Sequence, residues 1–180
     1  MTPSRPREFI ASLQKLAAAA DRGALADLRH GVADAVACRA WPHIAPYCDL
    51  RNQHELPAFI VVGAGFAMHG QTSPQAGNLG STLRRIAVEG REGNRSEALN
   101  SFAGRFRRLL TCNSVAEVCG RLPAVLRAAA RQGLAVNYQM LLDDLLKWRD
   151  QTHRDEVKLR WAAAYWGASP EEYEKGGEDQ

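Results

Sequence analysis

The chain has 180 residues, of which 46% are hydrophobic and 24% are charged. A chain of this length buries enough surface to fold without a metal or a disulfide, and it suits one domain or two small ones that share an interface. The composition excludes a fibrous protein and a chain that is disordered throughout.

The net charge is only +3, but the charges are unevenly spread. Residues 84–131 carry 10 basic and 4 acidic side chains, whereas residues 132–180 carry 6 basic and 10 acidic ones. Arginine supplies 19 of the 23 basic residues, a ratio that codon bias in a GC-rich genome explains; codon bias does not explain the clustering. Because guanidinium groups bind phosphate in two places, the central block predicts a polyanionic partner.

Neither the cysteines nor the apolar segments indicate export or membrane insertion. The four cysteines form no Cys-x-x-Cys pair and no secretory signal precedes them, so we expect reduced thiols in a cytoplasmic protein. The longest apolar run, residues 56–68, is too short to cross a bilayer. We therefore expect a soluble protein that does not contact a membrane.

The first half of the chain has apolar residues at helical spacing. Helices are predicted to start near Phe9 and Leu25, and a short segment opens at Trp41 and Pro42. Residues 56–68 are predicted to form a buried helix in which Gly63 and Gly65 let a neighbour approach. A loop follows over residues 70–80, and Leu79, Leu83 and Ile86 belong to a short basic helix.

The next segment carries most of the arginines. Asn94 is predicted to cap a helix, with Glu97 three residues further on. Leu99, Phe102, Phe106 and Leu109 form one apolar stripe; Arg107 and Arg108 fall on the opposite side, with Arg105 at the flank.

A second arginine-bearing helix should follow. Ser114 and Glu117 have the spacing of a capping box, and Pro123 is expected to restart the helix at a first-turn position. Arg127 and Arg131 lie one turn apart and face the same way, and Gly133 ends the helix.

Two amphipathic helices are predicted near the end of the sequence. In residues 138–149 the leucines and Trp148 form the apolar side, and Asp143 and Asp144 are expected at the surface. Residues 154–166 carry two apolar stripes, so that helix is either buried on two sides or buried once and used for docking. Residues 167–180 are typical of a flexible acidic tail.

Alternating β patterns are scarce, and we therefore predict an all-α fold, a compact bundle of about eight or nine helices. Residues 1–166 form the helical domain, either as one unit or as two packed halves with a boundary near residues 112–114. The tail over residues 167–180 lies outside it.

Enzymatic and metal sites find little support. The segment FIVVGAGFAMHG (59–70) imitates a dinucleotide-binding turn, but the third glycine position holds Met68 and no convincing second strand follows. Cys38, His43 and Cys48 could supply three metal ligands, but their spacing is unlike that of zinc sites and a fourth ligand is undefined. Buried, inert cysteines are the preferred interpretation. We predict no catalytic residue, no metal and no cofactor.

The arginines carry the strongest chemical signal. They are predicted to form a surface that follows a phosphate backbone, and only four acidic residues share their block, too few for local pairing. The alternative is a set of solvated helix faces with local salt bridges. The positions concerned are Arg84, Arg85, Arg105, Arg107, Arg108, Arg121, Arg127 and Arg131.

Several stretches together resemble a known family. They are LPAFIVVGAGFAMHG, NLGSTLRRIA, RFRRLL, LPAVLRAAARQGLAVNYQMLLDDLLKW and VKLRWAAAYW. Their order and spacing over about residues 9–166 resemble the CasB-type small subunit of Cascade, the type I-E CRISPR surveillance complex.

The resemblance implies an all-helical, non-enzymatic subunit that acts in antiviral defence. It implies two copies beside the guide-RNA backbone and the large subunit. It also implies a basic surface that holds single-stranded DNA of the R-loop, with guide RNA as a further contact. Sequence specificity then comes from base pairing with the guide. By position, the implied nucleic-acid-binding residues are Arg29, Arg84, Arg85, Arg105, Arg107, Arg108, Arg127 and Arg131. His30 stands where the pattern often has a second basic residue.

Two hypotheses remain beside an enzyme with a bound metal or nucleotide. The first is a non-catalytic subunit that binds nucleic-acid backbone without sequence specificity. The second is a helical adaptor that binds only proteins, motivated by the two apolar stripes of the last helix.

Overall fold

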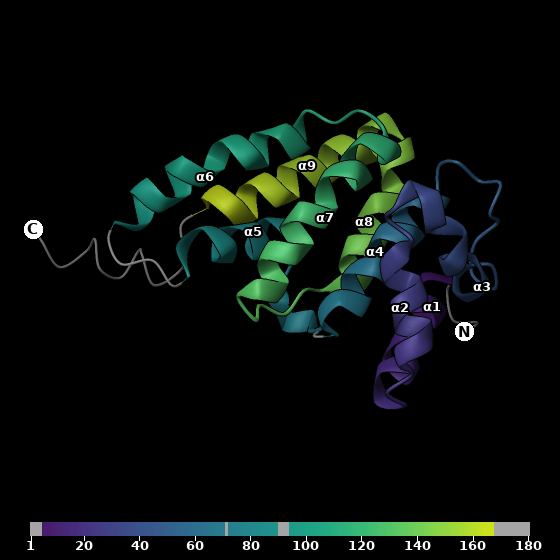
Figure 1. The fold of residues 1–180 in the computed structure, drawn as a ribbon. Helices are drawn as coiled ribbons and strands as arrows, with labels where there is room; N and C mark the ends of the chain where they lie inside the picture. The colour runs from purple at the N-terminus through teal and green to yellow at the C-terminus, as the bar shows by residue number, and fades with distance from the viewer. Residues whose placement is uncertain (1–4, 71, 90–93, 168–180) are drawn as a thin grey trace, which may run out of the picture.

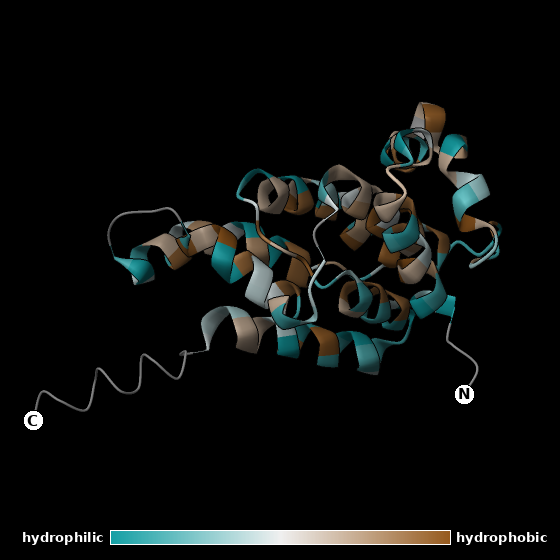
Figure 2. Cartoon of the chain, turned by 90° about the horizontal axis from the view of Figure 1, so that it is seen from below, coloured by the Kyte–Doolittle hydropathy of each residue, from teal (hydrophilic) through white to brown (hydrophobic). Residues whose placement is uncertain are grey.

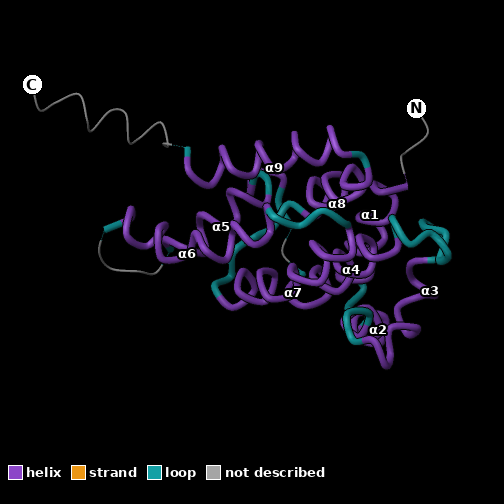
Figure 3. The backbone as a smooth tube through the Cα atoms, turned by 90° about the horizontal axis from the view of Figure 1, so that it is seen from above, coloured by secondary structure: helices purple, strands orange, loops and turns teal. Residues whose placement is uncertain are grey.

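The computed structural model describes residues 5–70, 72–89 and 94–167. Nine α-helices and three short 3₁₀ helices make up the described part of the chain, and its only β-type pairing is one isolated bridge between Thr72 and Val136 (Figures 1 and 3). The predicted all-α class is confirmed. The α-helices are α1 (Arg5–Ala18), α2 (Arg22–His30), α3 (Trp41–Ile44), α4 (Leu56–His69), α5 (Leu79–Val88), α6 (Arg95–Leu110), α7 (Val115–Arg131), α8 (Tyr138–Leu146) and α9 (Gln151–Trp166). The 3₁₀ helices are η1 (Asp34–Ala40), η2 (Pro74–Ala76) and η3 (Lys147–Arg149).

Helix α4 forms the centre of one part of the core. It is buried along most of its length and packs against α1, α2, α7 and α8. A Cβ atom on Gly63 would lie 3.1 Å from Leu28 and 3.2 Å from Phe9, and one on Gly65 would press on Leu126 and Tyr138. The glycines therefore allow the close packing that the sequence predicted, and the segment that imitates a dinucleotide-binding turn is a continuous helix.

Helices α5, α6 and α9 pack together in the other part. α5 lies against both α6 and α9, and Phe106 of α6 stacks on Tyr165 of α9 with 4.5 Å between ring centroids. Arg84 donates from Nη1 to the Tyr165 carbonyl oxygen over 2.9 Å, and the Tyr165 hydroxyl donates to the Leu99 carbonyl oxygen over 2.8 Å. Along the outer helices polar and apolar stretches alternate, as expected for helices with one buried side (Figure 2).

Asp144 corrects one prediction. It is 2% exposed rather than at the surface, because its carboxylate accepts hydrogen bonds from Trp161 Nε1 at 2.7 Å and from Arg160 Nη2 at 2.6 Å. Burial raises the pKa of this carboxyl group, and the hydrogen bonds and the nearby cations oppose that effect. The residue joins α8 to α9.

Pro123 corrects a second prediction, since it lies inside α7 rather than at a helix start. Proline cannot donate to the carbonyl group four residues earlier, but Leu122 and Leu126 on either side of it are fully buried and hold the helix together. The predicted helix over residues 138–149 is a shorter α-helix, α8, continued by η3. The last helix begins at Gln151, three residues earlier than predicted, where the Asp150 carboxylate caps it.

The cysteines only partly follow the prediction. Cys48, Cys112 and Cys119 are buried, but Cys38 is exposed in η1, which packs beside α2 and α3. In the part of the chain that the structure describes, no helix is both long and apolar enough to cross a membrane. The predicted acidic tail lies outside the described residues.

Candidate nucleic-acid interface

A groove runs between α6 and α7, the two arginine-rich helices. The helices are antiparallel and joined by a short loop (Figure 1). The groove has a volume of about 350 Å³, with an apolar floor and arginines along its sides. Its lining residues are Phe102, Arg105, Arg108, Leu109, Gly120, Arg121, Ala124, Val125 and Ala128.

The groove exists because the facing side of α7 is made of small residues. Gly120, Ala124 and Ala128 recur every four residues, which places them in one row along the helix. α6 packs mainly against α5, and α7 packs mainly against α4, so each helix has its own support. The row of small side chains leaves the space between the two helices open.

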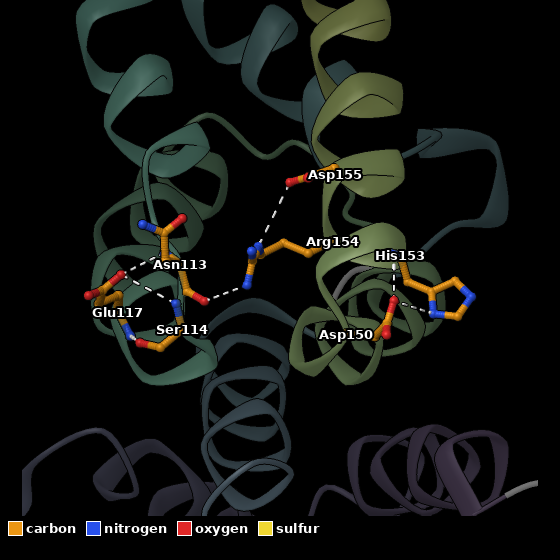
Figure 4. Close-up of polar contacts among 7 residues, drawn as sticks. All are labelled: Asn113, Ser114, Glu117, Asp150, His153, Arg154 and Asp155. Carbon is orange, nitrogen blue, oxygen red and sulfur yellow. Dashed lines mark hydrogen bonds and ion pairs between the residues drawn. The ribbon is translucent and has the colours of Figure 1, made fainter.

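The loop that joins the two helices is held by hydrogen bonds. Ser114 and Glu117 form the predicted capping box, and the Glu117 carboxylate also accepts from the Asn113 backbone N–H over 2.7 Å (Figure 4). These backbone hydrogen bonds lower the pKa of Glu117. Arg154 of α9 donates to the Asn113 carbonyl oxygen over 2.8 Å. The start of α7 is thereby tied to α9 as well as to α6.

Arg105 and Arg108 lie on the α6 side of the groove, and Arg121 lies on the α7 side. All three side chains are exposed. The Arg105 guanidinium lies 5.5 Å from the centre of the Phe102 ring, and Arg108 Nε donates to the Gly104 carbonyl oxygen over 3.3 Å. These contacts hold two of the three cations beside the groove. No carboxylate belongs to the described lining of the groove.

Three predicted arginines of α6 and α7, Arg107, Arg127 and Arg131, do not line the groove. Arg107 points to the opposite side of α6, where its guanidinium lies 6.0 Å from the Trp166 ring. Arg127 and Arg131 are exposed on α7 and extend the basic surface along that helix. The two arginines lie one turn apart, as predicted.

The other predicted positions are not gathered at this groove. Arg84 is half-buried and serves the packing of α5 against α9. Arg85 pairs with Glu89 over 3.4 Å. Arg29 is exposed on α2, which packs against α4, and its Nε donates to the Leu25 carbonyl oxygen. Three arginines of the predicted set therefore have structural contacts within their own part of the fold.

Arg121 lines the groove, although the family resemblance did not imply a binding role for it. It belongs to the basic block of the sequence. The row formed by Gly120, Ala124 and Ala128 is the sequence signal that could have paired it with Arg105 and Arg108.

The geometry does not favour a metal or nucleotide site. Within the described ranges, no three His, Cys, Asp or Glu side chains come together in a way that could hold a metal ion. Cys48 is buried while Cys38 is exposed, and His43 lies 3.6 Å from Asp27, so the three side chains that the sequence analysis weighed as ligands and set aside have separate surroundings.

Chemically, the groove combines fixed positive charge with an apolar surface. Guanidinium groups donate paired hydrogen bonds to phosphate oxygens and need no particular base. Phe102, Leu109 and Val125 form an apolar floor beneath the exposed cations, with Phe102 and Leu109 themselves buried. The arrangement suits a flexible anionic chain that carries some apolar surface.

Comparison with protein families gives the chain its relatives. The model of the family described as CRISPR-associated protein Cse2 matches residues 24–166, which is most of the chain. This chain belongs to the Cse2 family. None of the curated proteins matches it.

Solved structures of Cse2 and CasB proteins have the same fold. A CRISPR-associated protein of the Cse2 family from Thermus thermophilus superposes with a TM-score of 0.72 and 27% identity, covering 92% of this chain and 100% of that one. CasB from M. ruber gives a TM-score of 0.68 at 20% identity, covering 96% of each chain. A chain of a CRISPR RNA-guided surveillance complex gives 0.66 at 24% identity, covering 89% of this chain and 91% of that one. The last two likenesses concern the fold alone.

Proposed function

We propose that this chain is a non-catalytic subunit of a CRISPR surveillance complex. Its α6–α7 surface binds nucleic-acid backbone without sequence specificity and stabilises the displaced strand of the R-loop during antiviral defence. The other subunits of such a complex, a second copy of this chain and the guide RNA are its proposed partners, and the cytoplasm is its proposed location. Family membership and the likeness to a surveillance-complex chain support this assignment.

The observation that carries the proposal is the groove between α6 and α7. Arg105, Arg108 and Arg121 converge on it from two helices, and its described lining contains no acidic side chain. Each phosphate neutralised by arginine releases condensed counterions, so affinity depends on salt rather than on base sequence. Arg127 and Arg131 lengthen the positive surface along α7.

The test is fluorescence anisotropy with labelled single strands of two unrelated sequences at several salt concentrations. We expect equal affinity for both sequences. The variant R105A/R108A/R121A should weaken binding about tenfold or more at low salt. The slope of log K against log salt should fall by about 2, since each phosphate contact on a single strand contributes about 0.7.

The matched control removes three exposed arginines from other parts of the molecule. R7A/R22A/R51A changes the net charge by the same amount but leaves α6 and α7 intact. It should retain most of the affinity and the slope. Equal weakening by both triple variants would mean that net charge rather than this groove is responsible, and circular dichroism checks that both variants fold.

A protein adaptor without nucleic-acid contact is the second candidate. The observation in its favour is an apolar stripe on the outer side of α9, where Leu159 is 70% exposed and Trp166 is 41% exposed. Ala163 lies between them and is also exposed. Absence of strand binding by the wild-type chain at low salt would favour this candidate over the first.

A further inference from the structure

We propose that the acidic segment over residues 168–180 docks in the α6–α7 groove of its own chain and competes there with nucleic acid. The segment Glu171-Glu172-Tyr173-Glu174 is the part that fits. The docking does not depend on the proposed function, whereas the competition does.

The chemistry of the segment complements that of the groove. An aromatic residue, Tyr173, stands among three glutamates, and the whole stretch over residues 168–180 has five acidic side chains and one basic one. The groove has the opposite pattern, with Phe102, Leu109 and Val125 on the floor and three arginines on the sides. A tyrosine ring can cover the floor while the flanking carboxylates pair with the guanidinium groups.

The groove is also within reach of the segment. α9 ends at Trp166, whose ring stacks on Phe106 of α6 with 5.0 Å between centroids and lies under the Arg107 guanidinium. The segment therefore starts beside α6, on the side away from the groove. A helix with its side chains is about 10–12 Å across, and the six Cα–Cα steps from Gly167 to Tyr173 span up to about 20 Å when extended.

Docking would reduce the apparent affinity for a strand without preventing binding. If the segment occupies the groove for about four fifths of the time, the apparent Kd for a competing strand rises about fivefold. The segment is tied to the same chain, so its local concentration does not change with dilution. Such a contact would displace weakly held strands more readily than strands that make many phosphate contacts.

The first experiment detects docking in the absence of nucleic acid. The photoreactive substitution Tyr173→p-benzoylphenylalanine is placed in the full chain, and crosslinked peptides are mapped by mass spectrometry. We expect crosslinks within one chain to peptides of α6 and α7, with a lower yield when R105A/R108A/R121A is added. Leu159→p-benzoylphenylalanine, at an exposed position on α9, gives the background. Crosslinks to other elements, or only between two chains, would overturn the docking.

The second experiment detects competition by strand anisotropy. The variants E171Q/E172Q and Y173A should each bind a single strand about fivefold more tightly than the wild-type chain. The control E8Q/E156Q removes two exposed carboxylates, one from α1 and one from α9. Its affinity for the strand should exceed that of the wild type only by the small effect of the changed net charge. Equal tightening by test and control would overturn the competition. Loss of strand binding in every variant would refute the proposed function, and the crosslinks would still decide whether the segment docks.

Discussion

Arginine side chains that are close together on α6 serve two different surfaces. Arg105 and Arg108 border the groove, whereas Arg107 lies over Trp166 on the other side of the helix. Helical spacing predicted that all three avoid the core, and it grouped Arg107 with Arg108. The position of α7 decides the grouping, because it makes one flank of α6 into the wall of a groove.

Asp144 illustrates how tertiary contacts override a sequence pattern at a single residue. Asp143 and Asp144 are adjacent acids on one helix, but only Asp144 meets Trp161 and Arg160 of α9. A buried carboxylate is tolerated where its oxygens accept hydrogen bonds from such partners. The partners come from a helix that the periodicity of α8 does not reveal.

The four thiols should differ sharply in reactivity. Burial is the main cause that raises the pKa of the Cys48 thiol to about 11. At pH 8 only about a thousandth of this thiol is therefore in the reactive thiolate form. Cys112 and Cys119 are buried, whereas Cys38 is exposed. With Ellman's reagent at pH 8 we expect one fast thiol per native chain and four after unfolding.

The variant C38S identifies that thiol. It should remove the fast reaction and leave three thiols that react only in denaturant. A fast thiol that persists in C38S would contradict the described burial of Cys48, Cys112 or Cys119.

At the scale of elements, close packing of α5 against α9 depends on one glycine. A Cβ atom on Gly80 would lie 2.7 Å from the Trp161 carbonyl carbon and 2.9 Å from its Cα, in the backbone of α9. Because backbone cannot move aside as a flexible side chain can, we expect G80A to lower the free energy of unfolding by about 3 kcal/mol. Urea denaturation measures the change.

Gly104 provides the matched control on α6. Nothing lies within 4 Å of a Cβ atom built at Gly104, which sits in the middle of the helix. Alanine has the higher helix propensity, so G104A should stabilise the protein by about 0.5 kcal/mol. Equal effects of the two substitutions would mean that helix propensity rather than packing governs the α5–α9 contact.

At the scale of the whole molecule, the described surface offers two separate areas for partners. The groove and its arginines lie between α6 and α7, and the apolar stripe of Leu159, Ala163 and Trp166 lies on α9. Exposed apolar side chains that lie side by side are typical of protein interfaces. The proposed complex gives each area a use, since one can bind a nucleic-acid strand while the other contacts a neighbouring subunit.

The substitution L159D tests this division. Leu159 is so exposed that the fold and the strand affinity should remain unchanged, while incorporation into a reconstituted surveillance complex falls about tenfold or more. Size-exclusion chromatography of the assembled complex measures incorporation. V32D, at an exposed apolar side chain near α2, is the control and should incorporate normally. Full incorporation of L159D would mean that this stripe is not an interface.

The helical class and most helices followed from the sequence because apolar periodicity reports which side of each helix is buried. The Ser114 capping box, the glycines of α4 and the end of α7 were all predicted from local chemistry, and the structure confirms them. At Asn94 the cap is confirmed, but its side chain accepts from Ser96 N–H rather than forming a box with Glu97. The continuation of α7 through Pro123 was missed, since burial of its neighbours outweighs the lost hydrogen bond.

The sequence by itself determined that this protein is helical, that its positive charge is concentrated in residues 84–131, and that it resembles a family whose model matches it. These properties depend on composition, on local spacing and on the order of motifs along the chain. The tertiary structure decided which arginines share a surface. Arg84 is committed to α9, Arg107 lies over Trp166, and Arg105 joins Arg108 and Arg121. Such groupings depend on which helices become neighbours, and residues on different helices have no fixed relation until the core has packed.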